Sequence, residues 1–268
     1  MDSKVSIVFT TYNEKKNNLK LSLNSVINQT YNNIEIIICL EPDEKNKKII
    51  RKYLKNSSHL IIESKKKLGL TNALNLAIEK STGDYIARMD SDDIWMNNKI
   101  KKQLEYINEK KLDVIGSDIQ LINENGKKVG IRKYSKRNIK TNLLFQNGIC
   151  HPSVFLRKSV LNKYGNYDPA FKYCEDLELW LRLLSNGVKF GYIPEVLLKY
   201  RVAYNYGRDF VNWEFNIRAR LKYVFIIYNP ISAFLSLIIS ICIYFISRLK
   251  LNLVFNSLYR KLIINEKI

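Results

Sequence analysis

The chain has 268 residues, 46% of them hydrophobic, and a formal net charge of +19. This length and apolar content exclude a disordered chain and suit one substantial domain with an appendage. The charge indicates an anionic partner, but no basic stretch carries a nucleic-acid-binding signature, so we expect phosphorylated substrates or an anionic membrane and no nucleic acid.

The N-terminal 90 residues alternate between short apolar runs and helical patterns. Continuous apolar runs suit strands that are buried on both faces of a parallel sheet. We predict strands at residues 5–10, 34–40, 60–62 and 85–89. Helices are predicted between these strands, and the last of them covers residues 70–79. This alternation predicts an α/β, Rossmann-like fold whose mostly parallel central sheet is flanked by helices.

Polar residues follow the predicted strands at the carboxyl edge of the sheet, where ligands bind in such folds. They offer hydrogen-bonding groups, a ring for stacking and a close backbone approach to a nucleotide. Glu41 is placed to accept a hydrogen bond from a pyrimidine imide or a ribose hydroxyl. The predicted nucleotide-binding residues are Thr10, Thr11, Tyr12, Asn13, Glu41, Gly69, Asn72, Asn75 and Asp90. For Asn72 and Asn75, simple positions on a helix surface remain the alternative.

The motif Asp90-Ser91-Asp92-Asp93 is the sharpest chemical feature. Three carboxylates within four residues repel one another unless a cation or hydrogen-bond donors neutralise them. A hard divalent ion with oxygen ligands does this, and Mn²⁺ or Mg²⁺ also bridges to phosphates. We therefore predict a metal site at Asp92, Asp90 and Asp93, with Asp92 as the main ligand. Asp90 is expected to contact the ribose or the groups that surround the direct metal ligands.

The middle of the chain is less regular. We predict helices at 97–108 and 175–184, a turn at 123–126, and a polar stretch to about residue 142 that forms a loop and a short helix. Further strands are expected at residues 114–119, 151–157, 188–193 and 196–202. Arg201, within the last of these strands, could assist with phosphate contacts, but a surface ion pair is the favoured role.

The C-terminal part contains an uncharged apolar segment at residues 231–247 with basic residues on both flanks. It is slightly short for a membrane span, and basic flanks on both sides suit a segment whose ends stay on one face. Ser232, Ser236 and Ser240 form a stripe that could pack against another helix. We expect membrane contact, with in-plane or re-entrant insertion favoured over a full span; a buried core helix is the alternative.

Four motifs in this order resemble those of inverting family-2 glycosyltransferases with the GT-A fold, of the bacterial surface-polysaccharide type. They cover roughly residues 4–202 and consist of the stretches 5–14, 69–75, 83–93 and 175–180. The resemblance implies a GT-A catalytic domain at residues 1–205, which binds nucleotide-sugar and acceptor. The apolar pattern predicts a C-terminal helical, membrane-associated segment at residues 206–268. Two departures are the sequence after the second strand, Glu41-Pro42-Asp43, and the lack of a histidine after Arg201.

The resemblance implies an enzyme that moves a sugar from a nucleotide-diphosphate donor, often UDP-linked, to a hydroxyl of a glycan or lipid-linked acceptor. It assigns the catalytic base to Asp176 and an orienting or acceptor-binding role to Glu175; acids that simply favour a helix N-terminus are the alternative. With no signal-peptide pattern at the start, we expect a cytoplasmic protein that is peripheral or monotopic on the inner face of the cell membrane. His151 could be structural or could lie on the acceptor side.

Two other functions stay open at this point. A sugar nucleotidyltransferase would need a glycine-rich phosphate loop, which residues 10–14 do not provide. A non-catalytic nucleotide-binding adaptor at the membrane surface would be favoured by a missing base, whereas Glu175 and Asp176 are present.

Overall fold

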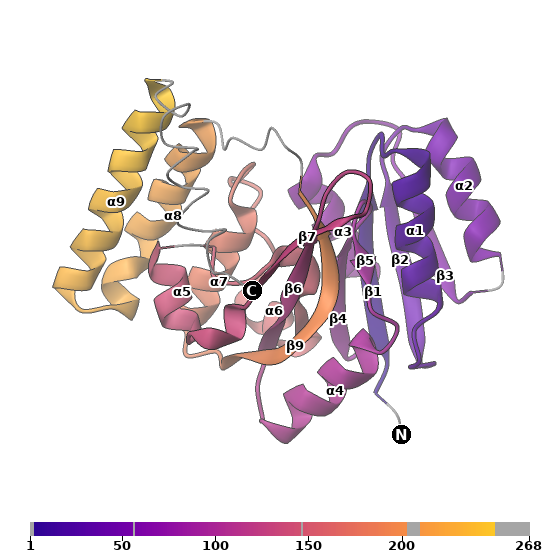
Figure 1. The fold of residues 1–268 in the computed structure, drawn as a ribbon, viewed down its shortest axis with the longest axis horizontal. Helices are drawn as coiled ribbons and strands as arrows, with labels where there is room; N and C mark the ends of the chain where they lie inside the picture. Colours follow the sequence, from indigo (N-terminus) through magenta and orange to yellow (C-terminus); the bar gives the residue numbers. More distant parts are fainter. Residues whose placement is uncertain (1–2, 56, 146, 203–209, 250–268) are drawn as a thin grey trace.

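The computed structural model describes residues 3–55, 57–145, 147–202 and 210–249. The described part is built around one mixed sheet with helices on both faces (Figure 1). The strands are β1 (Val5–Thr11), β2 (Ile34–Leu40), β3 (His59–Glu63), β4 (Tyr85–Asp90), β5 (Ile94–Trp95), β6 (Val114–Ile122), β7 (Lys128–Arg132), β8 (Phe155–Arg157) and β9 (Phe190–Arg201). The α-helices are α1 (Lys16–Ile27), α2 (Glu44–Leu54), α3 (Leu70–Lys80), α4 (Lys99–Glu109), α5 (Ile139–Phe145), α6 (Lys158–Tyr164), α7 (Glu175–Ser185), α8 (Phe210–Ile227) and α9 (Pro230–Arg248).

The strand order is β3-β2-β1-β4-β8-β6-β9-β5, and β7 pairs with β6 as a hairpin. Strands β3, β2, β1 and β4 are parallel, so their carboxyl ends lie at one edge. Strand β8 is antiparallel to both β4 and β6, and it joins the parallel half to the second half of the sheet. The parallel alternation predicted for the first 90 residues is confirmed.

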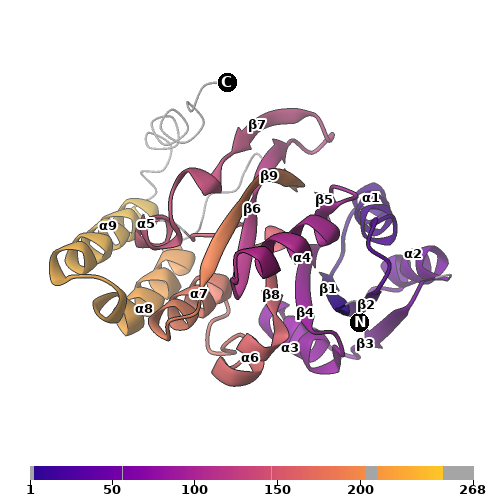
Figure 2. The ribbon, with the colours of Figure 1, turned by 90° about the horizontal axis from the view of Figure 1, so that it is seen from below.

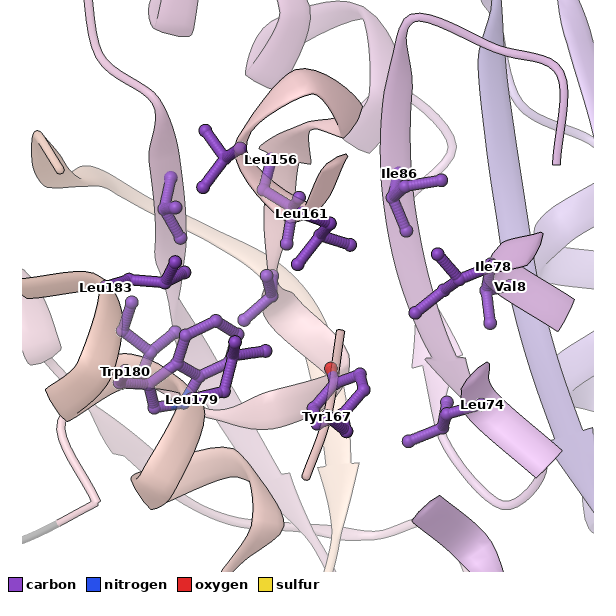
Figure 3. Close-up of a cluster of buried hydrophobic side chains, with 14 of the residues drawn as sticks. Val8, Leu74, Ile78, Ile86, Leu156, Leu161, Tyr167, Leu179, Trp180 and Leu183 are labelled. Atoms are coloured by element: carbon purple, nitrogen blue, oxygen red, sulfur yellow. The ribbon is translucent and has the colours of Figure 1, made fainter. Parts of the chain in front are cut away.

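Two hydrophobic cores lie on the two faces of the sheet because side chains alternate along each strand. Val5, Ile7 and Phe9 of β1 face α1, α2 and α4, whereas Val8 faces the other side. On that second face, α3, α6 and α7 bury the cluster shown in Figure 3, in which Trp180 is fully buried. The sheet is therefore a rigid support from which the strand ends project.

Two predicted strands differ from the structure. Residues 151–157 form a 3-10 turn (His151–Ser153) followed by the short strand β8, because Pro152 suits the first turn of a helix and has no N–H for a sheet. The strands predicted at 188–193 and 196–202 are one strand, β9, whose register against β6 shifts between Ile193 and Val196. A bulge thus absorbs Pro194 without ending the strand.

Four elements were not predicted: the short strand β5, the hairpin strand β7, and the helices α6 and α8. Strand β5 has two residues, too few for any periodic signal. In β7 both Val129 and Ile131 are exposed, so burial imposes no pattern on it. The proposed domain boundary at 205/206 and the residues Ala203 to Tyr206 lie outside the described residues.

The predicted apolar helix at 231–247 is confirmed as α9, which packs antiparallel to α8 at one end of the molecule (Figures 1 and 2). Ser236 and Ser240 face inward and are buried, while Ser232 is half-buried. The serine stripe therefore packs against protein, as predicted.

Candidate active site

A pocket of about 260 Å³ lies at the carboxyl ends of the parallel strands. Strand β1 is the centre of this edge: Thr10 pairs with Cys39 of β2 on one side and with Asp90 of β4 on the other. The pocket is lined by Thr10, Thr11, Tyr12, Cys39, Glu41, Lys67, Gly69, Leu70, Ala73, Asp90 and Ser91. Six of the predicted nucleotide-binding residues are in this set, brought together from segments 80 residues apart.

Glu41 lies in the pocket wall and is 5% exposed. Its Oε1 accepts a hydrogen bond of 2.7 Å from the backbone N–H of Gly69, which holds the β2 loop against the start of α3. Its Oε2 is buried and has no hydrogen-bond partner among the described residues. A buried carboxylate oxygen without a partner is costly, so this atom is suited to accept a hydrogen bond from a ligand.

Gly69 and Asn13 both have positive φ angles, of 78° and 50°. Gly69 adopts this conformation without steric cost and begins α3, so its N–H can turn toward Glu41. Asn13 tolerates it better than most residues, and its N–H donates to Asp43 Oδ2 at 3.0 Å. Asn13 is therefore placed in the loop after β1 and not among the pocket-lining residues.

Tyr12 and Lys67 form the open side of the pocket. The Tyr12 ring is 50% exposed, and Lys67 Nζ lies 4.4 Å from its centroid. This cation–π pair places a positive charge and a flat ring next to each other, which suits a negatively charged nucleotide. Lys67 was not singled out from the sequence because it lies in a run of three lysines with no motif.

Asn72 and Asn75 are not brought into the pocket. Asn72 Nδ2 donates to Leu68 O at 2.9 Å, one turn back along the chain. Asn75 makes a reciprocal pair with the backbone of Tyr167, with bonds of 2.8 and 3.1 Å. Asn75 therefore anchors the loop before α7 to α3, and the predicted nucleotide contact has no support from its placement.

The acidic cluster forms the turn that follows β4. Oxygen atoms of Asp90, Asp92 and Asp93 all lie within 4.8 Å of one another. Asp93 is fully buried; its Oδ1 accepts from the Arg201 N–H at 2.8 Å, and its Oδ2 has no partner among the described residues. The neighbouring Arg88 forms an ion pair with Asp90.

Burial and mutual repulsion shift the proton equilibria of this cluster. Burial, with the charges of Asp90 and Glu14, raises the pKa of Asp92 to about 7. Burial, with the charges of Asp90 and Asp92, raises the pKa of Asp93 well above its usual range. One arginine does not neutralise three carboxylates, so the cluster fits a hard divalent cation with oxygen ligands.

Arg201 holds the turn in place. Its Nε donates to Asp92 O at 2.9 Å, and its Nη1 donates to the carbonyl oxygens of Asn123 and Glu124 at 2.9 and 2.8 Å. The side chain is 8% exposed, so the predicted surface ion pair is wrong. The sequence could not indicate this role, because the partners are 77 to 109 residues away.

Glu175 and Asp176 begin α7 directly after Cys174, which has a left-handed backbone with φ of 55°. This turn directs the chain into the helix and leaves Glu175 buried and Asp176 half-buried. Asp176 Oδ1 accepts from the Leu177 N–H at 2.7 Å, and Oδ2 accepts from Asn147 Nδ2 at 3.4 Å. The two predicted catalytic acids thus lie at one helix end with different environments.

Burial, followed by the charge of Asp176, raises the pKa of Glu175 to about 8. The charge of Asp90 also raises this pKa, while that of Arg88 lowers it. The acidic pair on α7 and the acidic turn after β4 therefore influence each other electrostatically.

His151 lies behind the acidic pair. Its Nε2 is 2.7 Å from Tyr167 Oη, and its Nδ1 is 3.7 Å from Glu175 Oε1. Burial, with the charge of Arg88, lowers the pKa of His151 well below its usual range, so the ring is neutral. Arg88 and Tyr167 are the members of this network that sequence reasoning missed. Arg88 lies two residues before Asp90 on β4 and therefore on the same face of the strand, which was the available signal.

The family profile and the relatives that match this chain are all glycosyltransferases. The profile of the family described as Glycosyl transferase family 2 matches residues 6–165. An uncharacterised glycosyltransferase of Methanocaldococcus jannaschii is 34% identical over 205 residues, which are 74% of this chain and 70% of that protein. The Escherichia coli UDP-Glc:alpha-D-GlcNAc-diphosphoundecaprenol beta-1,3-glucosyltransferase WfgD is 30% identical over 210 residues, 75% of this chain and 78% of that protein.

Solved structures share the fold at low sequence identity. S. aureus TarS matches with a TM-score of 0.65 and 18% identity over 82% of this chain, but over only 39% of its own. A shorter form of TarS in complex with UDP-GlcNAc has the same TM-score, 16% identity and coverage of 82% and 67%. The Pyrobaculum calidifontis mannosyltransferase PcManGT, solved with GDP-Man and Mn2+, has a TM-score of 0.64, 14% identity and coverage of 82% and 64%.

Proposed function

The chain belongs to glycosyl transferase family 2 and has a GT-A fold, and on that premise we propose that it is a metal-dependent inverting glycosyltransferase. It moves a sugar from a nucleotide-diphosphate donor to a hydroxyl of a glycan or lipid-linked acceptor. The observation that carries this proposal is the acidic turn Asp90–Asp93, whose carboxylate oxygens gather beside the strand-end pocket that Asp90 and Ser91 line.

The pocket at the ends of β1, β2 and β4 would take the nucleotide. Glu41 Oε2, which has no hydrogen-bond partner in the part of the chain that the structure describes, suits a ribose hydroxyl or the imide N–H of a pyrimidine. Tyr12 offers a face for stacking. UDP is our first choice of nucleotide, a choice supported by the shared fold with TarS, which has been solved with UDP-GlcNAc.

Asp92, Asp90 and Asp93 would hold Mn²⁺ or Mg²⁺. Their oxygen atoms are close enough to share one ion, and the excess negative charge of the turn suits it. When bound, the cation offsets the charge that develops on the leaving diphosphate. Arg201 fixes the backbone of this turn, so the ligands are already ordered without the ion.

Asp176 would act as the general base. The acceptor hydroxyl oxygen forms a bond to the anomeric carbon while the bond from that carbon to the diphosphate oxygen breaks on the opposite face. The diphosphate leaves with the electron pair, and the hydroxyl proton moves to Asp176. Glu175, whose pKa is raised to about 8, is protonated near neutral pH and adds no second negative charge beside the base.

We place the reaction at the cytoplasmic face of the cell membrane, in polysaccharide or glycolipid synthesis. Helix α9 is long and apolar enough, by length and composition, to cross a membrane. A relative's name includes a diphosphoundecaprenol-linked acceptor, which is a membrane lipid. A lipid-linked diphosphate acceptor would also suit a chain with a net charge of +19.

The test is turnover of nucleotide sugars with Mn²⁺ by the wild type and by Asp92→Asn and Asp176→Asn. Each variant keeps the side-chain shape but loses a metal ligand or the base, so we expect a fall of roughly 10²-fold or more. Glu109→Gln, an exposed carboxylate-to-amide change at the end of α4, is the matched control and should retain full activity. Wild-type turnover by both aspartate variants would refute the mechanism.

A further inference from the structure

The hairpin of α8 and α9 has a large apolar outer surface. Ile231 is 82% exposed, Ile226 is 67% exposed and Phe234 is 57% exposed. We define the hairpin face as the exposed apolar residues Leu221, Phe225 and Ile226 of α8 and Ile231, Phe234, Leu235, Ile238, Ile241 and Phe245 of α9. Phe225 and Phe234 contact each other edge to face with centroids 5.2 Å apart, so the face is continuous across both helices.

Helix α9 is oriented with its largest apolar side chains outward. Exposed residues recur every three or four positions along its length, whereas Ala233, Ser236 and Ser240 face the protein. In a helix on the surface of a soluble domain the apolar stripe faces the core. The outer stripe of α9 therefore needs an apolar partner that the described part of the chain does not supply.

We propose that the hairpin face binds an anionic lipid bilayer by lying in its interface, and that α9 does not cross the membrane. A bilayer suits both the apolar stripe and the net charge of +19. A second copy of the chain would also cover apolar surface, but it would bring two strongly positive molecules together. The charge therefore favours the lipid surface over self-association.

The buried contacts of Arg220 exclude a spanning orientation. Its guanidinium is 1% exposed and joins three helices: Nη1 donates to Ser236 Oγ of α9 at 2.9 Å and to Leu143 O of α5 at 2.7 Å, while Nε donates to Asn216 Oδ1 of α8 at 2.7 Å. If α9 spanned the membrane alone, its contacts with Arg220 would be lost. If α8 entered the hydrocarbon together with α9, Glu214 and Lys222 on its exposed side would be buried in lipid, which is costly.

The hairpin also packs against α7, the helix that carries Glu175 and Asp176. Helix α8 packs on α7, and Tyr223 Oη of α8 donates to Glu178 Oε1 of α7 at 2.8 Å. Glu178 lies one turn after Glu175 on the same helix. If Asp176 is the base, as the proposed function requires, the bilayer is held next to the helix that receives the acceptor, which favours an acceptor attached to a lipid.

Binding is tested by flotation of the full chain with vesicles of phosphatidylcholine alone or with phosphatidylglycerol. We expect binding to the anionic vesicles, and a fall of roughly tenfold or more for Phe234→Glu/Ile238→Glu, because the two charges oppose insertion of the face. Leu60→Glu/Val129→Glu changes two similarly exposed apolar residues on β3 and β7 and should bind like the wild type. Equal binding by the α9 variant, or no binding by the wild type, would overturn the proposal; a concentration-dependent dimer without lipid binding would assign the face to a second copy.

Orientation is tested with Cys242, an exposed cysteine of α9. A fluorophore on this thiol would lie about 5 Å from the bilayer centre if α9 spanned, but about 5–10 Å below the headgroups if it lies in plane. Lipids that carry a quencher near the headgroup should therefore quench the fluorophore more strongly than lipids that carry it near the end of the acyl chain. The variant Cys242→Ser gives the background from labelling of other cysteines. Stronger quenching by the deep label would overturn the in-plane orientation. Neither flotation nor quenching depends on turnover. The membrane proposal can therefore fail while the proposed activity stands, and the activity can fail while membrane binding stands.

Discussion

Single residues at this site act mainly through the backbone segments that they connect. Arg201 is the clearest example, since it joins the acidic turn at Asp92 and Asp93 to the β6–β7 turn at Asn123 and Glu124. Such a contact orders the proposed metal ligands without itself belonging to the ligand set. It is a positioning role, and it can be separated from catalysis by its effect on metal affinity.

We expect Arg201→Lys to raise the Mn²⁺ concentration needed for half-maximal turnover by about tenfold, with a smaller effect on turnover at saturating Mn²⁺. Lysine keeps the charge but cannot reproduce the fork of donors, and each lost charged hydrogen bond is worth about 1.5–3 kcal/mol. Mn²⁺ titration of activity measures this, with the exposed Arg137→Lys as the control. An unchanged Mn²⁺ requirement would assign Arg201 to general stability alone.

Burial of Glu175 makes the stability of the folded protein depend on pH, because it raises the pKa of this carboxyl group. Its folded-state pKa of about 8 lies above the ordinary carboxyl value of 4.5, so between these values the folded state binds more protons than the unfolded state. Stability should therefore fall as pH rises from 4.5 to 8. For Glu175→Gln in metal-free buffer we expect a gain in Tm over wild type that grows across this range, measured by thermal melts at pH 5, 6.5 and 8. Glu79→Gln, an exposed site on α3, should show no such trend.

At the scale of elements, the contacts between α5, α8 and α9 depend on one buried cation. The Arg220 guanidinium makes 2.7–2.9 Å hydrogen bonds to all three helices, and it satisfies carbonyl oxygens of Leu143 and Leu144 at the end of α5. Helix ends leave such carbonyls without intrahelical partners. The hairpin is thus attached to the rest of the described structure by polar contacts as well as by the apolar packing of Ala219 and Tyr223 against the main core. Val224, Ala233 and Leu237 hold α8 and α9 to each other.

We expect Arg220→Met to destabilise the protein by about 3–5 kcal/mol, because its removal leaves buried polar partners unsatisfied. Amide exchange of α5 and α9 should increase more than that of β1 and β4, since the lost contacts join only the helices. Urea unfolding and hydrogen exchange measure both effects. Arg218→Met, on the exposed side of α8, is the matched control, and an equal loss in both variants would contradict the role of Arg220.

At the scale of the whole molecule, the sheet and the hairpin, which are packed together through α7, carry two different surfaces. The strand-end pocket would take a water-soluble donor, and the hairpin face would take the lipid surface. Helix α7 lies between them because it carries the acidic pair at its start and packs against α8 along its length. If both proposals hold, these two surfaces would bring a soluble donor and a membrane-bound acceptor to the same molecule.

Local sequence patterns were enough to predict the parallel half of the sheet, the strand ends that form the pocket, and the position of α9. These are local properties: apolar runs define buried strands, and polar residues at their ends must lie at the carboxyl edge of a parallel sheet. The same patterns did not predict β5, β7 or the 3-10 turn at His151, which are too short or too exposed for a periodic signal.

The partners of the buried polar side chains, in contrast, depend on how the elements pack in three dimensions. Asn75 bonds to the backbone of Tyr167, Arg201 to Asp92, and Arg220 to Leu143, across 92, 109 and 77 residues. A buried polar group must find a partner, but any nearby carbonyl can serve, so the residue type does not reveal which one it is. Long-range pairing of this kind depends on the final packing of elements, and for that reason the pocket could be predicted while the contacts that hold it in shape could not.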